Sequence, residues 1–248
     1  MDKTVLITGG SRGIGAATAL LAARQGYAVA VNYSANSLAA DEVVRQIRQA
    51  GGQAMTVQAD VANEAQVVAM FEKIDAKFGR LSALVNNAGV VDQTVRVEAI
   101  TLARLRRMFE INVFGSFLCA REAVRRMSTR HGGAGGAIVN VSSAAARLGA
   151  PGQYVDYASA KGAIDTFTVG LAKEVAAEGI RVNAVRPGII ETDIHASGGL
   201  PDRARDMAPL VPMQRAGSAE EVAESIVWLL GASSSYTTGA LLDVTGGR

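Results

Sequence analysis

The chain has little of what a metalloprotein, a disulfide-stabilised protein or a membrane protein requires. Its 248 residues contain one cysteine, Cys119, so no disulfide can form within the chain. The two histidines, His131 and His195, have no neighbouring cysteine or paired carboxylates, which predicts that there is no metal site. No apolar run reaches membrane-spanning length, and no signal peptide is visible. We therefore expect a cytoplasmic protein without a membrane partner.

An excess of one charge is also missing. The formal net charge is +2 and no dense block of Lys and Arg occurs, so we expect no nucleic-acid partner. The arginines within 104–107 and 121–126 have the spacing of solvated helix faces. With 49% hydrophobic and 19% charged residues, the composition is that of a soluble protein, and we predict one domain over residues 1–248.

What is present is a regular alternation of short apolar runs with longer helical patterns. The runs TVLIT, YAVAVNY and GAIVNVSS are near-continuously hydrophobic, as strands covered by helices on both faces are. This alternation predicts right-handed βαβ units in an α/β, doubly wound parallel sheet. Long helices are expected near 101–129 and 218–231. Residues 190–217 interrupt the rhythm with Gly and Pro, and we expect a substrate loop or lid there rather than a plain surface loop.

The first strand runs into TGGSRGIG, residues 8–15, which opens a helical pattern. Glycines permit left-handed turns and let backbone N–H groups approach a pyrophosphate. Such a stretch alone is also compatible with a tight turn that binds nothing. The strand before it and the helix after it favour a dinucleotide-binding site.

The end of the second strand favours NADP(H) over NAD(H). An NAD site usually has an acidic residue there, but this chain has Asn32, Tyr33 and Ser34. Arg12, inside the glycine loop, can make a charge-assisted contact with a 2′-phosphate. The alternative is that Arg12 points to solvent.

The stretch YVDYASAK, residues 154–161, contains a candidate acid/base group. Tyr157 and Lys161 are four residues apart and share one face of a helix, whereas Tyr154 is too distant for direct contact with the lysine. A free tyrosine has a pKa of about 10, and a nearby ammonium lowers it. We therefore expect Tyr157 to have a lowered pKa and to exchange a proton with a carbonyl or alcohol oxygen. The alternative is a half-buried aromatic at a helix start.

Together these motifs resemble a known family. TGGSRGIG, NNAG at 86–89, Asn112, NVSS and YASAK occur in the order typical of short-chain dehydrogenases/reductases, and the chain is similar to their one-domain branch over nearly its whole length. 3-Oxoacyl-carrier-protein reductases and glucose dehydrogenases are among the branches that it resembles. The resemblance implies a Rossmann-type sheet of seven parallel strands with helices on both faces, binding a nicotinamide cofactor.

The resemblance also implies functional positions. The four catalytic positions fall on Asn112, Ser143, Tyr157 and Lys161. The residues expected to contact the cofactor are Gly9, Ser11, Arg12, Gly13, Ile14, Gly15, Asn32, Tyr33, Ser34, Asp60, Val61, Asn87, Ala88, Gly89, Tyr157, Lys161, Pro187, Gly188, Ile190 and Thr192. In such a site Lys161 also binds the nicotinamide ribose, and Asn112 helps to place a water in a proton relay.

Two of these assignments have alternatives. Ser142 and Ser143 are adjacent, and adjacent strand residues face opposite ways, so only one can point into the site. The alignment of NVSS favours Ser143, whose hydroxyl would hold the substrate oxygen. Asn112 could instead be an ordinary polar residue within a helix.

The sequence thus predicts an NADPH-dependent oxidoreductase that acts on a small-molecule carbonyl or secondary alcohol. An NADP(H)-binding sensor without turnover is the alternative, although a sensor would not need the serine, tyrosine and lysine. An epimerase or dehydratase would usually need a longer substrate domain. Two helical segments, 109–124 and 157–176, are apolar over more than one stripe, and with the resemblance they predict a homotetramer or dimer.

Overall fold

Seven parallel strands form one sheet in the computed structural model, which describes residues 3–193 and 198–248. Their order across the sheet is β3-β2-β1-β4-β5-β6-β7. The strands are β1(Lys3–Ile7), β2(Tyr27–Tyr33), β3(Ala54–Gln58), β4(Ala83–Asn86), β5(Gly136–Val141), β6(Ile180–Pro187) and β7(Leu241–Val244). The predicted Rossmann-type, doubly wound α/β fold is confirmed.

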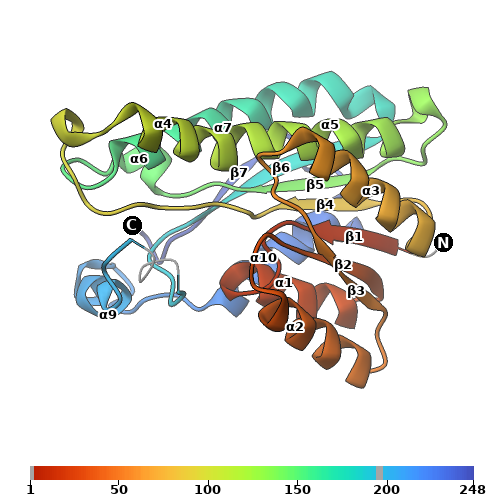
Figure 1. Ribbon diagram of the computed structural model, residues 1–248, viewed down its shortest axis with the longest axis horizontal. Helices are drawn as coiled ribbons and strands as arrows, with labels where there is room; N and C mark the ends of the chain where they lie inside the picture. Colours follow the sequence, from red (N-terminus) through yellow and green to blue (C-terminus); the bar gives the residue numbers. More distant parts are fainter. Residues whose placement is uncertain (1–2, 194–197) are drawn as a thin grey trace.

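Helices cover both faces of the sheet, as the near-continuous apolar strands require. The longer ones are α1(Gly13–Arg24), α2(Ser37–Gln49), α3(Glu64–Phe78), α4(Leu102–Phe109), α5(Gly115–Met127), α7(Val155–Val175) and α10(Ala219–Leu230). The short α-helices are α6(Ala145–Leu148) and α9(Arg203–Met207), and the 3-10 turns are η1(Val97–Ala99), η3(Thr129–His131), η4(Ala176–Glu178), η5(Ala208–Leu210) and η6(Ala232–Ser234). In Figure 1, α3, α4, α5 and α7 lie above the sheet, and α1, α2 and α10 lie below it.

The core is divided by the sheet into two apolar layers. Successive side chains of a strand point to opposite faces. In β1, Val5 and Ile7 accordingly pack in the layer that contains α1, α2 and α10, whereas Leu6 packs in the layer that contains α3, α5 and α7. All three side chains are fully buried. The strand register is therefore fixed from both sides, which fixes where each strand ends.

The strand order reverses between β1 and β4. The chain adds β2 and β3 on one side of β1 and then crosses to place β4 on the other side. The loops that follow β1 and β4 consequently leave in opposite directions at the carboxyl ends of the strands, where doubly wound sheets bind ligands. These ends point to the left half of Figure 1.

The long helix expected near 101–129 is observed as one continuous helical run, from α4 through α5, that contains a π-helical turn. A π-helical turn, η2(Glu110–Phe114), separates α4 from α5. Single π-turns inside α-helices frequently occur at functional sites. The buried residues of this turn are Asn112 and Val113, so the widened turn places Asn112 toward the interior. The helix expected near 218–231 is observed as α10.

The segment 190–217 leaves the sheet and returns to its starting point. Ile190 and Gly217 form an isolated parallel bridge, and the Gly217 N–H donates to the carbonyl of Ile189 at 2.9 Å. Within the described part of the segment, Ala204 and Val211 pack with Ile189 in a small apolar cluster of their own. His195 lies outside the described residues. None of the helices that the structure describes is long and apolar enough to cross a membrane.

Candidate active site

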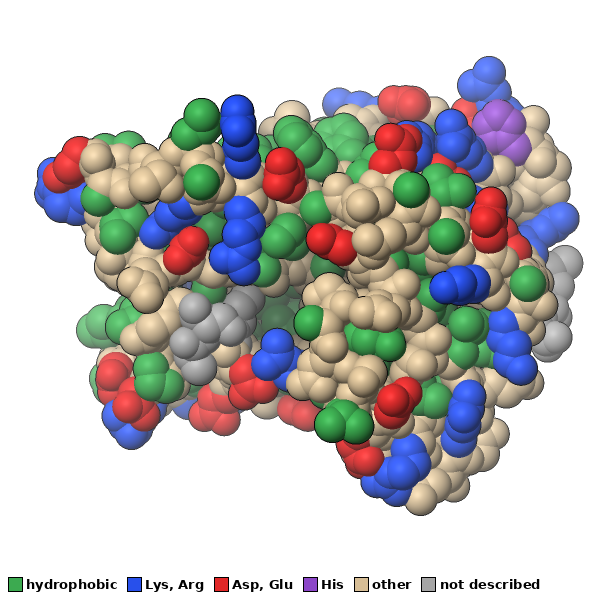
Figure 2. All heavy atoms as spheres, in the orientation of Figure 1, with side chains coloured by type: hydrophobic (Ala, Val, Ile, Leu, Met, Phe, Trp, Pro, Cys, Tyr) green, Lys and Arg blue, Asp and Glu red, His purple; other side chains and the backbone are tan. Residues whose placement is uncertain are grey.

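Two adjoining hollows lie at the carboxyl ends of the strands. One has a volume of about 470 Å³ and runs along the glycine loop and the ends of β2 and β4. The other, about 450 Å³, lies between the start of α7 and the end of β6. Ile14, Asn87, Gly89 and Thr192 line both hollows, which therefore meet along these residues. Figure 2 shows the molecule hollowed between the part that carries α9 and the helices α1 and α2.

The glycine loop leaves the first turn of α1 open to an anion. Gly9 and Gly13 have φ angles of +59° and +50°, which favour glycine. A Cβ on Gly15 would lie 2.4 Å from the Gly9 carbonyl oxygen, so only glycine fits at this packing contact. α1 has no side-chain cap and no acidic residue in its first turn. Its free N–H groups and its dipole thus suit a phosphate.

Two side-chain amides, one buried and one half-buried, hold this loop from opposite sides. Asn32 Oδ1 accepts from Gly9 N at 3.2 Å, and Asn32 Nδ2 donates to the carbonyls of Val57 and Ala59 at 3.3 and 3.0 Å. Asn87 Nδ2 donates to the carbonyls of Thr8 and Gly9 at 2.9 and 3.0 Å. Asn32 is 2% exposed. Because its side-chain oxygen and nitrogen both bond to main-chain groups, Asn32 supports the glycine loop from the wall of the hollow.

The other residues expected at the adenosine end come together in the first hollow. Tyr33, Ser34 and Asp60 line the same hollow as Arg12, and the Arg12 side chain is exposed at its edge. Arg107, from α4, also lines this hollow and was not expected there. Because the arginines of α4 have the spacing of a solvated face, no local pattern indicated that Arg107 lines the cleft. Val61, Ala88 and Gly13 complete the predicted set on this side.

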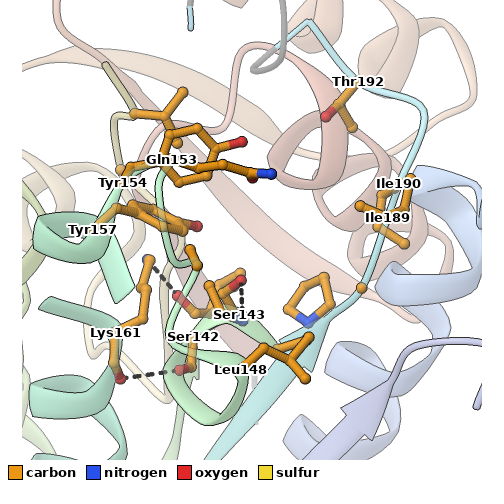
Figure 3. Close-up of a pocket in the computed structure, with 18 of the residues that line it drawn as sticks. Ser142, Ser143, Leu148, Gln153, Tyr154, Tyr157, Lys161, Ile189, Ile190 and Thr192 are labelled. Carbon is orange, nitrogen blue, oxygen red and sulfur yellow. Dashed lines mark hydrogen bonds between the residues drawn. The ribbon is translucent and has the colours of Figure 1, made fainter. Parts of the chain in front are cut away.

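The second hollow brings together three of the four predicted catalytic side chains. Ser143 follows β5, while Tyr157 and Lys161 lie one turn apart on α7, and all three line the same wall (Figure 3). The Lys161 ammonium donates to the Val141 carbonyl at 2.8 Å, and Ser142 Oγ donates to the Lys161 carbonyl at 3.2 Å. The neighbouring serine is therefore used to join β5 to α7. Ser143 Oγ lies within hydrogen-bonding reach of the Tyr157 phenol.

The pKa of Tyr157 is opposite to the expectation. Burial raises it to about 12, and the hydrogen bond with Ser143 opposes that rise. Lys161 Nζ lies 5.6 Å from the centre of the Tyr157 ring and donates to a carbonyl instead of to the phenol. Burial lowers the pKa of Lys161 to about 8, and the charge of Asp165 one turn further along α7 opposes that decrease. Desolvation thus outweighs the hydrogen bond with Ser143 at Tyr157 and the charge of Asp165 at Lys161.

Asn112 supports the loop that separates it from Lys161. Its side-chain nitrogen donates to the carbonyls of Val90 and Met108, both at 3.0 Å, and its oxygen accepts from Val90 N at 3.2 Å. A Cβ on Gly89 would lie 2.7 Å from Asn112 Oδ1 and 3.4 Å from Lys161 Nζ. Only glycine therefore fits between the two predicted catalytic residues. The water-placing role of Asn112 stays a prediction.

A chain of buried polar side chains connects the cofactor side with the helix that carries Tyr157. Asn86 Nδ2, at the end of β4, donates to Asn140 Oδ1 at 2.9 Å, and Asn140 Nδ2 donates to Thr168 Oγ1 at 2.9 Å. Thr168 lies on α7 and Asn140 on β5. The sequence analysis did not find this network, because its members are 54 and 28 residues apart. It fixes β4, β5 and α7 relative to one another.

Comparison with known proteins assigns the family. A family model described as enoyl-(acyl carrier protein) reductase matches residues 9–248. The chain belongs to the short-chain dehydrogenase/reductase family. It is 60% identical to the uncharacterized oxidoreductase YgfF of Escherichia coli over 98% of each chain. It is 41% identical to cis-4-hydroxycyclohexanecarboxylate dehydrogenase of Sinomonas cyclohexanicum, over 99% of this chain and 96% of that protein.

Two further relatives agree with this assignment. The chain is 39% identical to 3-oxoacyl-[acyl-carrier-protein] reductase of Synechocystis over 99% of its length and 96% of that protein. A solved Serratia marcescens short-chain dehydrogenase/reductase, a double mutant, superposes with a TM-score of 0.90 at 34% identity and covers 99% of this chain and 97% of that one. This short-chain dehydrogenase/reductase is accordingly an oxidoreductase.

The cleft of this short-chain dehydrogenase/reductase fits the nicotinamide cofactor that the family implies. The uncapped first turn of α1 can hold the pyrophosphate, and the hollow continues without a break past Asn87 and Gly89 to Tyr157 and Lys161. Pro187, Gly188, Ile190 and Thr192 form the opposite wall, and Figure 3 shows Ile190 and Thr192 across the opening from Tyr157. Among residues 3–193 and 198–248, no cluster of His, Cys, Asp and Glu could hold a metal ion.

The outer part of the second hollow contains residues that the sequence analysis missed. Leu148 and Ile189 provide apolar surface, and Gln153, Tyr154 and Arg203 close the far end. Arg203 Nη2 donates to Gln153 Oε1 at 2.7 Å, and its guanidinium carbon lies 5.3 Å from the centre of the Tyr154 ring. This contact spans 50 positions of the sequence, so no local pattern could have indicated it. Cys119 is buried, and burial raises the pKa of its thiol to about 12, so it is an inert residue of the core.

We predict that Asn32 contributes chiefly to stability. Asn32→Ala leaves a buried backbone donor and two buried acceptors without partners, which lowers the free energy of unfolding by about 2–3 kcal/mol. Urea denaturation measures this loss. The matched control is Asn36→Ala, which removes an exposed cap of α2 accepting from Ala39 N and costs about 1 kcal/mol. Equal losses in the two variants would contradict the structural role of Asn32.

Proposed function

We propose that this enzyme is an NADPH-dependent oxidoreductase that transfers a hydride between the nicotinamide and a carbonyl or secondary alcohol, with Tyr157 as the general acid/base. The observation that carries the proposal is the convergence of Ser143, Tyr157 and Lys161 in the second hollow, which adjoins the hollow along the glycine loop. A bound nicotinamide would supply or accept the hydride. The protein supplies proton transfer, orientation and the exclusion of water.

Tyr157 donates its proton during carbonyl reduction. Because its pKa is raised to about 12, the phenol is fully protonated at neutral pH and is ready to act as a donor. Ser143, within hydrogen-bonding reach of the phenol, holds the substrate oxygen next to the proton that it receives. In the oxidative direction the phenolate form of Tyr157 accepts the hydroxyl proton of the alcohol, while Ser143 holds the alcohol oxygen.

Lys161 joins the substrate site to the cofactor site. Its ammonium is buried with Gly89 as a close neighbour, on the border of the cofactor cleft. We assign it two tasks: to bind the ribose next to the nicotinamide, and to stabilise the phenolate that remains after Tyr157 has given up its proton. A positive charge serves both tasks, so Lys161 should act in its protonated form.

The preference for NADPH rests on two features of the adenosine end. Positions 32–34 supply no carboxylate that would repel a 2′-phosphate. Arg12 lies exposed at the edge of this part of the cleft, and no carboxylate pairs with it among the described residues. A phosphate bound there would therefore receive an unshared guanidinium charge.

The substrate side of the proposal rests on the second hollow and on the relatives. The 41% identical relative is named for a hydroxycyclohexanecarboxylate, and the 39% identical one for a 3-oxoacyl-[acyl-carrier-protein]. Both names describe a hydroxyl or ketone carbon that changes oxidation state. We assign the same chemistry to this chain and regard the described part of 190–217 as its substrate loop, within one domain. A sensor without turnover is the alternative, and it would leave Ser143, Tyr157 and Lys161 without a task.

Assembly as a homotetramer or dimer stays a prediction. Phe114 and Phe117 are 55% and 47% exposed, and Phe117 stacks on Phe167 of α7 with ring centres 3.8 Å apart. These aromatic rings lie on the two helical segments whose apolar faces predict association. The cytoplasmic location also stays a prediction.

One prediction tests the acid/base role of Tyr157. Tyr157→Phe should reduce NADPH-dependent turnover of an activated diketone by a factor of about 100 or more while NADPH affinity is nearly unchanged, because only the proton donor is removed. Absorbance of NADPH measures turnover, and quenching or enhancement of its fluorescence measures binding. Tyr236→Phe, at a fully exposed tyrosine, is the control. Native turnover in Tyr157→Phe would defeat the assignment, and tight NADPH binding without turnover of any carbonyl or alcohol by the native protein would favour the sensor.

Another prediction concerns the pH dependence of turnover. Lys161 has a pKa of about 8, so kcat/KM for reduction should stay level through neutral pH and fall above pH 8 as the ammonium is lost. Asp165 raises the pKa of Lys161, and Asp165→Asn should therefore move this fall to lower pH. The pH dependence of kcat/KM measures the shift. Glu72→Gln, at an exposed position of α3, should leave the profile unchanged. Identical profiles for the native protein and Asp165→Asn would contradict the electrostatic link.

A further prediction concerns the choice between NADPH and NADH. Arg12→Ala should lower the ratio of NADPH to NADH affinity about tenfold to a hundredfold, since a charge-assisted contact to the 2′-phosphate is lost. Titration of both cofactors gives the ratio. Arg24→Ala, at the other end of α1, removes an exposed arginine of the same helix and is the control. An unchanged ratio in Arg12→Ala would refute the role of this residue.

A further inference from the structure

The far end of the substrate hollow carries positive charge without an acidic residue to balance it. Three cationic side chains line this hollow: Lys161, Arg203 and Arg248. Among the residues that the structure describes, no Asp or Glu lines it. Lys161 is engaged with the Val141 carbonyl at the catalytic end, which leaves the two arginines at the outer end.

The carboxylates nearest to Arg203 in the chain are used by a different arginine. Asp202 Oδ1 pairs with Arg205 Nη1 at 3.0 Å, and Asp206 Oδ1 pairs with Arg205 Nη2 at 3.3 Å. Arg205 points to solvent, with a side chain that is 74% exposed. Arg203 is the half-buried arginine of α9, and it forms no ion pair with the described acidic residues.

Arg203 is held in place by neutral groups. Its guanidinium donates to Gln153 Oε1 at 2.7 Å and lies over the Tyr154 ring. The charges of Arg203 and Arg248 both act on Tyr154 and oppose the rise of its phenol pKa that burial causes. A guanidinium that is oriented by an amide and an aromatic ring keeps its charge and most of its five N–H donors for a further partner.

Gln153 adds donors of its own. An arginine can only donate, so the amide oxygen of Gln153 must face Arg203 and the NH₂ group must face the other way. Gln153 lies at the top of the opening in Figure 3, above Tyr157 and Ser143. Among the described residues no Asp or Glu lines the hollow, and the main-chain oxygen of Arg248 already accepts from Arg147 Nη2 at 2.6 Å. The outer end therefore presents N–H donors and positive charge, which suits a carboxylate.

The distance from this end to the catalytic groups suits a small molecule. The Tyr154 ring separates the two, because its centre lies 5.3 Å from the Arg203 guanidinium and 6.1 Å from the centre of the Tyr157 ring. Leu148 and Ile189 add apolar surface elsewhere in the same hollow. A ligand that reaches both ends needs a short apolar body with an oxygen function at one end and an anion at the other.

We infer that Arg203, oriented by Gln153, binds the carboxylate of the substrate, and that the substrate is a small hydroxy acid or oxo acid. The inference rests on the proposed function for the reacting end of that molecule. It makes Arg203 a specificity-determining residue, whereas Ser143 and Tyr157 contact the reacting oxygen of the substrate. Neutral ketones lack the group that Arg203 recognises and should bind more weakly.

The test is a comparison of acids with their esters. Two oxo acids of different shape, 4-oxopentanoate and 4-oxocyclohexanecarboxylate, are titrated by calorimetry into the NADP⁺-loaded protein, each beside its methyl ester. The ester keeps the ketone and the apolar body but removes the charge. We expect at least one of the two acids to bind about tenfold to a hundredfold more tightly than its ester, as a charge-assisted contact predicts.

Three variants locate the effect. Arg203→Met should bring the ratio of acid to ester affinity close to one. Gln153→Glu should do the same without removing the arginine, because the new carboxylate would occupy Arg203 from within the protein. Arg205→Met, two residues away on the same helix, should keep the native ratio because Arg205 pairs outside the hollow.

The outcomes separate this inference from the proposed function. Equal affinities of acid and ester for the native protein, no measurable binding of either acid, or a native ratio in Arg203→Met would each overturn the inference. Calorimetry requires no turnover, so its result stands whether or not NADPH is consumed. Reduction of neutral diketones without any advantage for acids would leave the proposed function intact and remove the inference. A clear preference for acids without turnover of any carbonyl compound would support the inference and contradict the proposed function.

Discussion

The site depends on the way two asparagine amides hold the glycine loop after β1. Asn32 fixes the loop to the ends of β2 and β3, and Asn87 fixes it to the end of β4. These strands lie on opposite sides of the point where the strand order reverses. The loop is therefore held open over the first turn of α1, where its N–H groups can meet a phosphate. Without these contacts, neither the open helix end nor the continuity of the two hollows would be maintained.

Burial, more than charge pairing, determines the chemistry of the second hollow. Burial keeps the Tyr157 phenol protonated, and it lowers the pKa of Lys161 toward neutral pH. The same apolar surroundings thus shift the pKa values of the two groups in opposite directions. Asp165 counteracts part of the effect on Lys161 from one turn away, and the Arg186 side chain in turn pairs with Asp165 at 2.8 Å. The electrostatics of the site therefore extends into the end of β6.

Local patterns in the sequence predicted the fold and the inner part of the site, but they did not predict its outer part. The strand–helix rhythm, the glycine spacing and the four-residue interval between Tyr157 and Lys161 are all local, and the structure places each as expected. The prediction that the pKa of Tyr157 is lowered was wrong, because the burial of a side chain cannot be inferred from its neighbours in the sequence. The π-turn around Asn112 has no clear local signal. The contact of Arg203 with Gln153 joins segments 50 residues apart, and only the folded chain brings them together.

The closed bridge between Ile190 and Gly217 has a consequence for how such enzymes diverge. Because the chain leaves and re-enters at one point, changes in the length or composition of the intervening segment do not alter the register of β6 with β5 or β7. The cofactor cleft is built almost entirely by other parts of the chain. This excursion can therefore change as a unit without moving the strand ends where the predicted catalytic residues lie.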